Sequence, residues 1–391
     1  MQLSKRIANL QPYPFAELEG IVEGLRKTGV APIDFGVGDP VDPTPTFIRE
    51  ATKKAVDDYA TAGYPSYIGS EDFREAIAAW FEKRFEMKLD LETEITSSIG
   101  SKEAIFNFPL TCIDQGDVVL IPTPGYPPYA RGTEFGGGEP YFLPLLEENN
   151  FLPDLEKIPP EIAKRAKIFW VNYPNSPTGR NAPDEFLKKA VKFCEENEII
   201  LASDMAYSEI YFDAKPKSIL EFTRKNVIEF HSLSKRSRMT GYRVGFVVGD
   251  AEIIDSFKKV KTNVDSGTPN FLQAAAIAAF EDEKHVAESI AEYREKRDVL
   301  ISALESVGLE KTQTEATFYV WQKVPDGMSS EDFAKKLLAP EIAVVATPGS
   351  WISDETADGL NPGEGFVRFA LVPTVEQVRE AAERIRNNLK I

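Results

Sequence analysis

The middle of the chain alternates between short apolar runs and longer amphipathic stretches. Apolar runs rich in β-branched residues predict strands at 117–121, 168–171, 199–202, 227–230 and 244–248. Unbroken apolar runs are typical of strands that are covered on both faces. Apolar residues recur at helical spacing in segments 71–85 and 183–197. Strands that alternate with helices predict an α/β fold with a mostly parallel sheet.

The C-terminal part has a different order of elements. We expect a long charged helix at 282–306, a strand at 318–324, a helix near 330–338, a strand at 365–372 and a closing helix from 375. This order predicts a smaller α+β unit. We therefore expect a large domain at 46–281 and a small domain formed by 1–45 and 282–391. The N-terminal arm is expected to pack on the small domain or to reach a partner subunit.

Charge and cysteine content narrow the classes of function. Among 391 residues, 45 are basic and 62 are acidic, which gives a net charge of −17. Such a surface repels nucleic acid and anionic lipid, so we expect neither as a partner. Cys112 and Cys194 are too few for a disulfide framework, and the N-terminus lacks the apolar core of a signal peptide. We therefore expect a cytoplasmic location.

The sequence gives little sign of a membrane span or a metal site. The longest stretch of small apolar residues, 274–280, is too short to cross a bilayer. No Cys/His cluster has the spacing of zinc ligands, so we expect no metal, although the sequence leaves a carboxylate site for magnesium open.

Chemically useful side chains follow the carboxyl ends of the predicted strands, which is where ligands bind in open α/β sheets. Loops are polar in any case, so one such residue is a weak signal, whereas the whole set supports a specific chemistry. In chain order the set is Tyr126, then Asn172, Asn175 and Ser176, then Asp204 and Tyr207, and then Ser232, Ser234, Lys235, Arg236, Arg238 and Arg243.

That chemistry is catalysis with pyridoxal phosphate. A lysine amine such as that of Lys235 forms a Schiff base with an aldehyde cofactor. The cofactor also needs an acid for its ring nitrogen, which we assign to Asp204, and a donor for its ring oxygen, which we assign to Tyr207. Tyr126 is expected to stack on the ring. The expected phosphate donors are Ser232, Ser234 and Arg243, with Gly100, Ser101 and Lys102 at a predicted helix start.

These segments resemble class I and II aminotransferases of fold type I, and the resemblance runs essentially end to end. The segment SLSKRSRMTGYRVG at 232–245 is similar to the Schiff-base segment of that family, and SDMAY at 203–207 is similar to its D-x-x-Y pattern. The resemblance implies a large domain with a mostly parallel sheet flanked by helices, plus a smaller α+β domain. It further implies a homodimer in which Tyr64 reaches the phosphate of the neighbouring subunit, with Gly38 and Arg368 at the substrate carboxylate.

One position departs from the family pattern. The family usually has N-P-T-G, whereas this chain has Asn175-Ser176-Pro177-Thr178-Gly179, so either Asn175 or Ser176 is expected to contact the ring oxygen. Segments 259–273, 318–338 and 347–351 resemble diaminopimelate-type aminotransferases more closely. This finer resemblance implies LL-diaminopimelate or N-succinyl-LL-diaminopimelate as the amino donor and a 2-oxo acid such as 2-oxoglutarate as the acceptor.

Several alternatives stay open or lose support. An aspartate or broad-specificity aminotransferase, and a pyridoxal-phosphate β-lyase, would have the same cofactor site. A cofactor-sensing regulator would need an added DNA-binding domain, for which we expect no room in this chain.

Two motifs of other protein classes fit the sequence only in part. SLSK at 232–235 fits the S-x-x-K motif of penicillin-binding proteins, but KTG at 27–29 precedes it, which is the reverse order. The string GVGDPV at 36–41 differs from the G-x-G-x-x-G dinucleotide motif.

Overall fold

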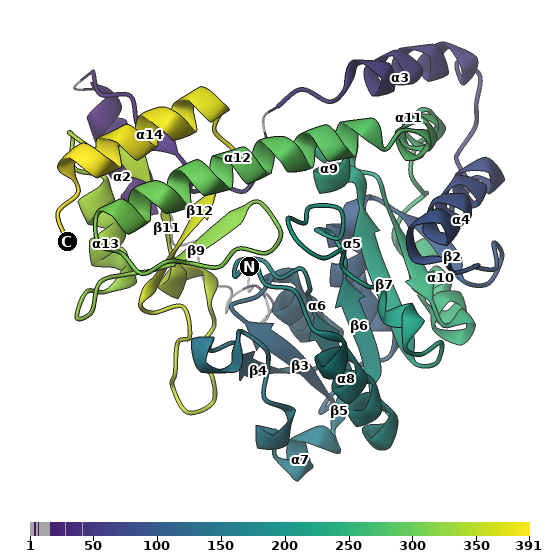
Figure 1. The fold of residues 1–391 in the computed structure, drawn as a ribbon. Helices are drawn as coiled ribbons and strands as arrows, with labels where there is room; N and C mark the ends of the chain where they lie inside the picture. The colour runs from purple at the N-terminus through teal and green to yellow at the C-terminus, as the bar shows by residue number, and fades with distance from the viewer. Residues whose placement is uncertain (1–3, 5–6, 8–15, 28, 41) are drawn as a thin grey trace.

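A computed structural model describes residues 4, 7, 16–27, 29–40 and 42–391. It contains a seven-stranded sheet with strand order β2-β8-β7-β6-β5-β3-β4 and a three-stranded sheet with order β11-β12-β9. Helix α12 (Lys284–Ser306) runs from one sheet region to the other (Figure 1). The fold is therefore α/β with a mostly parallel main sheet, as the sequence predicts.

All five strands predicted in the middle of the chain are present in the main sheet. Strands β3 to β7 are parallel to one another, whereas β8 is antiparallel to both β7 and β2. The carboxyl ends of the parallel strands therefore meet at one edge. The strands are β2 (Ile95–Ser98), β3 (Val118–Thr123), β4 (Glu139–Pro144), β5 (Ala166–Val171), β6 (Ile200–Asp204), β7 (Val227–Ser232) and β8 (Gly245–Gly249).

Helices cover both faces of the main sheet, which explains the unbroken apolar runs. In β5, Phe169 packs in the core on one face, whereas Ile168 and Trp170 pack in the core on the other. This alternation follows the period of two residues along a strand. The first core includes side chains of α4 (Glu71–Phe85), α8 (Asp184–Asn197) and α11 (Asn270–Glu281). The second includes side chains of α5 (Gly100–Asn107), α6 (Pro128–Gly136) and α10 (Ala251–Val264).

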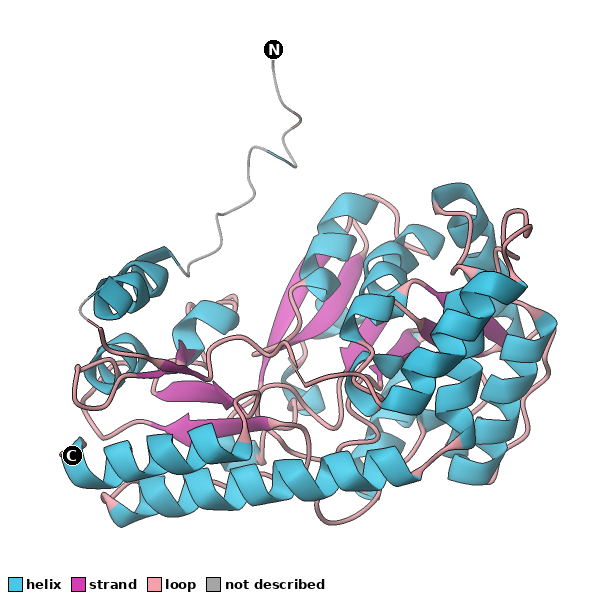
Figure 2. Ribbon diagram, turned by 90° about the horizontal axis from the view of Figure 1, so that it is seen from above, coloured by secondary structure: helices cyan, strands magenta, loops and turns pink. Residues whose placement is uncertain are grey.

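The smaller sheet is antiparallel and has its own apolar core. Figure 2 shows its strands beside the long helices at the end of the chain. Its elements are β9 (Tyr319–Lys323), β11 (Thr347–Pro348), β12 (Phe366–Ala370), α13 (Ser330–Leu337) and α14 (Val375–Asn388). The predicted order of elements after residue 282 is therefore confirmed.

Two N-terminal elements, a strand and a helix, pack against the smaller unit. Strand β1 (Ile33–Asp34) pairs with β10 (Val344–Val345), which brings the following segment beside the small sheet. Helix α2 (Ala16–Lys27) contributes Val22 and Leu25 to a cluster with Leu338. Most of the arm before residue 16 lies outside the described residues. The exact domain boundaries stay a prediction.

The described residues also form α3 (Thr46–Asp58), α7 (Pro160–Ala163) and α9 (Leu233–Arg236), together with short 3-10 helices. Across the described part of the chain, no helix has the length and apolar character needed to cross a membrane.

Candidate active site

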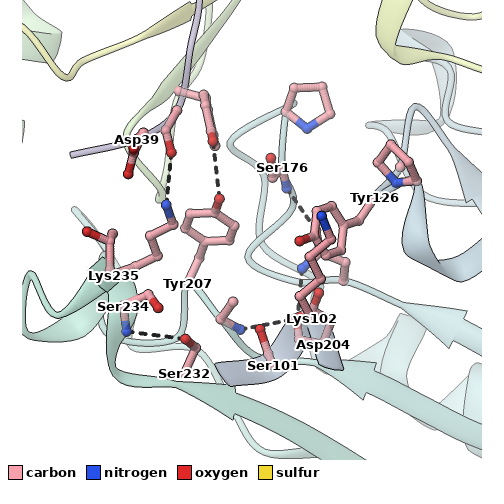
Figure 3. Close-up of a pocket in the computed structure, with 18 of the residues that line it drawn as sticks. Asp39, Ser101, Lys102, Tyr126, Ser176, Asp204, Tyr207, Ser232, Ser234 and Lys235 are labelled. Carbon is pink, nitrogen blue, oxygen red and sulfur yellow. Dashed lines mark hydrogen bonds between the residues drawn. The ribbon is translucent and has the colours of Figure 1, made fainter. Parts of the chain in front are cut away.

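A cavity of about 380 Å³ lies where the carboxyl ends of the central strands face the small sheet. Figure 3 shows Lys235 and Tyr207 on one side of it and Tyr126 and Ser176 on the other. Most of the predicted site residues line this single cavity. They are Gly38, Ser101, Lys102, Tyr126, Asp204, Tyr207, Ser232, Ser234, Lys235, Arg243 and Arg368.

Lys235 lies on the short helix α9, directly after β7. Its ammonium group donates a hydrogen bond to the carbonyl oxygen of Gly38, with 2.8 Å between Nζ and O. The same Nζ lies 5.2 Å from the centre of the Phe318 ring. The lysine therefore reaches across the cavity to the segment that follows β1.

The surroundings of Lys235 lower the pKa of its amine. The largest cause is burial, which disfavours the charged form, and the cations of Arg243 and Arg368 act in the same direction. Tyr319 and Asp39 oppose this shift. A lowered pKa increases the fraction of neutral amine, which is the nucleophilic and basic form.

Asp204 is the last residue of β6 and is 4% exposed. Its Oδ2 accepts a hydrogen bond from the Tyr129 hydroxyl at 2.6 Å, and its Oδ1 accepts one from the Ala206 amide at 3.1 Å. Burial raises the pKa of Asp204, and these hydrogen bonds partly offset the effect. A cation bound beside this carboxyl would stabilise its ionised form. The site is therefore suited to a buried, protonated heterocycle.

The N-terminus of α5 forms one end of the cavity. The residue before it, Ile99, provides no side-chain cap, so the first-turn amides have no acceptor from that residue. Gly100 has φ +69°, and a Cβ atom there would lie 2.3 Å from Nη2 of Arg243. Gly100 therefore allows the guanidinium to approach the helix start closely. Backbone amides beside an arginine attract an anion such as phosphate.

Hydroxyl groups extend this anion site. Arg243 donates from Nη1 to Ser234 Oγ at 3.3 Å and to the carbonyl oxygen of Thr240 at 2.8 Å. Ser232 Oγ accepts a hydrogen bond from the Ser234 amide at 3.2 Å. These contacts hold the donors at the same end of the cavity as Gly100.

The small sheet supplies a second cation to the cavity through Arg368 on β12. Its Nη2 donates to the carbonyl oxygen of Gly36 at 2.9 Å, while its buried Nε has no hydrogen-bond partner among the described residues. The guanidinium lies 4.8 Å from the centre of the Tyr319 ring. Arg368 therefore has free donor capacity for a carboxylate.

Several lining residues were not singled out by the sequence, among them Asp39, Thr240, Ile352 and Tyr319, and Tyr319 has the most contacts with predicted site residues. Its hydroxyl lies 3.2 Å from the hydroxyl of Tyr207, and both side chains line the cavity. Tyr319 stands inside the predicted strand FYVWQKV at 318–324, where an aromatic residue is normally assigned to the core. Only its position opposite the predicted site would have singled it out.

The two candidates for the ring-oxygen contact are placed differently in the structure. Ser176 lines the cavity, together with Asn172. Asn175 lies outside the cavity lining, and its Oδ1 accepts hydrogen bonds from the backbone amide and hydroxyl of Thr178. The Nδ2 of Asn175 is buried and has no hydrogen-bond partner among the described residues, so the assignment of the ring-oxygen contact to Asn175 or Ser176 stays a prediction. Tyr64 is also outside the cavity and is 88% exposed.

The arrangement fits pyridoxal phosphate at its phosphate, its ring nitrogen and its aldehyde. The anion cradle at Gly100 and Arg243 suits a phosphate, and the buried carboxyl of Asp204 suits a protonated ring nitrogen. Lys235 supplies an amine in the same cavity. In the described part of the chain, no three His, Cys, Asp or Glu residues are grouped in a way that could hold a metal ion.

Comparisons with known proteins agree with this geometry. The model of the family described as aminotransferase class I and II matches residues 30–385. An LL-diaminopimelate aminotransferase from Aquifex aeolicus is 47% identical over 390 residues, which cover 99% of each chain. Among solved structures, an aminotransferase from Neisseria meningitidis is 35% identical, with a TM-score of 0.91 over 98% of this chain and 99% of that one. A mutant aspartate aminotransferase from Thermus thermophilus is 26% identical, with a TM-score of 0.90 over 99% of each chain.

Proposed function

Because this chain belongs to the class I and II aminotransferase family, we propose that it uses pyridoxal phosphate to transfer an amino group from a diaminopimelate-type donor to a 2-oxo acid. The chain is an aminotransferase, and members of its family generally depend on pyridoxal phosphate. LL-Diaminopimelate is the proposed donor because relatives that carry this name are 42–47% identical over 98–99% of the chain. N-Succinyl-LL-diaminopimelate is the alternative donor, and 2-oxoglutarate is the proposed acceptor.

One observation carries the proposal. A single cavity brings Lys235, Asp204 and Arg243 from the large sheet together with Arg368 from the small sheet. An amine, a buried acid and an anion cradle match the needs of the cofactor, and a second arginine matches the α-carboxylate of an amino acid.

The cofactor contacts follow from this arrangement. We assign the ring nitrogen to Asp204, the ring oxygen to Tyr207 and Ser176, and one ring face to Tyr126. Lys235 provides the amine that joins the aldehyde. When bound, pyridoxal phosphate supplies that aldehyde and a protonated ring that accepts electron density from the substrate Cα. The proposed phosphate ligands are Gly100, Ser101, Lys102, Ser232, Ser234 and Arg243.

The protein's own groups then bind the substrate and move a proton. Arg368 holds the α-carboxylate with its planar fork of donors, and its Nε, which has no partner within the described ranges, supports this role. Gly38 lies beside that carboxylate in our assignment. Lys235, as a neutral amine, removes the proton from the substrate Cα, and the burial that lowers its pKa supports this role.

A homodimer in the cytoplasm is part of the proposal. Tyr64 is 88% exposed, which leaves it available to a second copy of the chain. Neither Cys112 nor Cys194 forms a disulfide, which is compatible with a reducing compartment. Sedimentation of the purified protein tests the dimer, and a monomer at micromolar concentration would contradict it.

A panel of amino donors tests the proposed substrate. Purified protein with pyridoxal phosphate and 2-oxoglutarate is supplied with LL-diaminopimelate, N-succinyl-LL-diaminopimelate, aspartate or glutamate, and kcat/KM is compared. We expect one of the two diaminopimelate donors to exceed aspartate by about 10-fold or more, because each polar group left unpaired in a buried site is costly. A higher value for aspartate would reject the diaminopimelate assignment. Release of pyruvate and ammonia instead of a new amino acid would indicate a β-lyase.

A further inference from the structure

We propose that Tyr319 is a positioning residue that joins the small-sheet arginine to Tyr207 and strengthens the hydrogen bond that Tyr207 donates to the cofactor ring oxygen. This inference rests on the proposed function for the identity of the cofactor. The contacts of Tyr319 are independent of that identity, and they carry the argument.

Tyr319 is packed between groups that act on different parts of the ligand. It is 4% exposed and lies on β9, where its partner in the ladder is Ala370. Arg368 pairs with Trp321, so Tyr319 and Arg368 are diagonal neighbours on adjacent strands. The Arg368 guanidinium lies 4.8 Å from the Tyr319 ring centre, which fixes both side chains relative to each other.

The hydroxyl of Tyr319 reaches the other side of the site. It lies 3.2 Å from the hydroxyl of Tyr207, which follows β6 in the large sheet. It also lies against Gly38, because a Cβ atom at that glycine would be 1.9 Å from the Tyr319 hydroxyl oxygen. Gly38 is the residue whose carbonyl accepts the hydrogen bond from Lys235. Tyr319 therefore contacts both Gly38, which we place at the substrate carboxylate, and Tyr207, which we place at the cofactor ring oxygen.

The hydrogen bond between the two phenols has a consequence for the cofactor. When Tyr319 is the donor, the hydroxyl proton of Tyr207 is free to be donated to a ligand oxygen. Burial raises the pKa of Tyr207, so Tyr207 keeps this proton at neutral pH. A hydroxyl that accepts one hydrogen bond becomes a better donor of the next, because successive hydrogen bonds polarise one another.

The experiment measures the visible absorption of cofactor-loaded protein as a function of pH. A donor to the ring oxygen stabilises its anionic form, so losing the donor raises the pH midpoint of the absorption change. Tyr207→Phe removes the direct donor and is expected to raise the midpoint by about 1 pH unit. Tyr319→Phe removes only the supporting donor and is expected to raise it by roughly a third of that amount.

Tyr293→Phe is the matched control. Tyr293 is buried in the same unit and stacks on Phe318, and its hydroxyl has no hydrogen-bond partner among the described residues. Its replacement removes the same hydroxyl group near the site, so the midpoint is expected to equal that of the wild type.

The double variant Tyr207→Phe/Tyr319→Phe shows whether Tyr319 acts through Tyr207. We expect its midpoint to equal that of Tyr207→Phe alone, because the second hydroxyl then has nothing to polarise. Additive shifts, or a wild-type midpoint in Tyr319→Phe, would overturn the inference while leaving the proposed function intact. A wild-type protein that develops no visible band with pyridoxal phosphate would instead overturn the proposed function.

Discussion

The two walls of the cavity are built differently. On the large-sheet wall, Asp204 ends a strand and Lys235 lies on a short helix directly after one, at the edge where parallel strands finish. On the small-sheet wall, Tyr319 and Arg368 lie within adjacent antiparallel strands. The first wall therefore presents loop and strand-end groups on a sheet buried on both faces, and the second presents strand side chains from a separate core.

This difference suggests a division of tasks. The large-sheet wall carries the groups that fit the cofactor, and the small-sheet wall carries the group that fits the substrate carboxylate. A contact between the walls, such as that between Tyr207 and Tyr319, then relates the two ligands to each other. Changes on one wall should therefore affect cofactor and substrate unequally.

The largest effect is expected on the large-sheet wall, from Asp204→Asn. A neutral amide cannot balance a protonated ring nitrogen, so kcat/KM should fall by about 10²–10³-fold. The control is Asp39→Asn, which changes an exposed carboxylate in the same cavity. Steady-state kinetics of both variants at saturating cofactor provide the measurement. An equal fall of kcat/KM in the two variants would show that Asp204 is no more important than another carboxylate in the cavity.

On the small-sheet wall, Arg368→Lys should act mainly on the substrate. A lysine keeps the charge but loses the planar fork, so KM for the amino donor should rise by roughly 10–100-fold. The dissociation constant of pyridoxal phosphate should stay within about a factor of two of the wild type, because Arg368 belongs to the other wall. Fluorescence titration with the cofactor measures this constant, and a parallel loss of cofactor affinity would break the division between the walls.

Gly100→Ala, on the large-sheet wall, should weaken cofactor binding and leave substrate binding nearly unchanged. The new Cβ would meet Nη2 of Arg243 at 2.3 Å, and the residue would keep a positive φ of +69°. We expect the cofactor dissociation constant to rise by about 10-fold, with little change in donor KM at saturating cofactor.

Gly137→Ala controls for backbone strain in the Gly100 experiment. Gly137 has φ +95°, and a Cβ there would have no atom within 4 Å. Gly137→Ala should lower the free energy of unfolding without weakening cofactor binding. If the cofactor dissociation constant rose equally in both variants, backbone strain and not the contact with Arg243 would explain the weaker binding.

The smallest expected effect is a change in the melting temperature of the cofactor-free protein. The pKa of Asp204 is raised in the folded protein by burial, so its contribution to stability is present below its unfolded pKa and is lost as pH rises through the folded pKa. Asp204→Asn should therefore raise the melting temperature of cofactor-free protein at pH 7 by a few degrees, with the difference shrinking toward pH 4. Thermal melts at the two pH values test this. A lower melting temperature at pH 7 would mean that the ionised carboxylate is well compensated.

The same contrast explains what the sequence could predict. The five central strands were predictable because they are buried on both faces and have unbroken apolar runs. The edge strands β2 and β4 were missed, since β2 is only ITSS and β4 contains Pro140 and Pro144, which an edge strand tolerates.

The site residues that could be predicted are also those next to unbroken apolar runs. Asp204 and Lys235 stand out because polar groups follow apolar runs there, whereas Tyr319 is hidden inside an apolar strand. The placement of Asn175 outside the cavity lining and of Ser176 inside it required the turn geometry, in which the Asn175 amide oxygen accepts hydrogen bonds from Thr178. The contact of Tyr319 with Tyr207 joins distant segments, and the bonds of Asn175 depend on local turn geometry, and hydropathy patterns reveal neither.

The most direct test concerns Lys235, the proposed amine that joins pyridoxal phosphate. Treating the cofactor-loaded protein with borohydride makes that bond irreversible, and peptide mass spectrometry then locates it. We expect a single major adduct on Lys235 and no such adduct in the Lys235→Ala variant. A major adduct on another lysine, or none on a protein that is catalytically active with the cofactor, would rule out this role of Lys235.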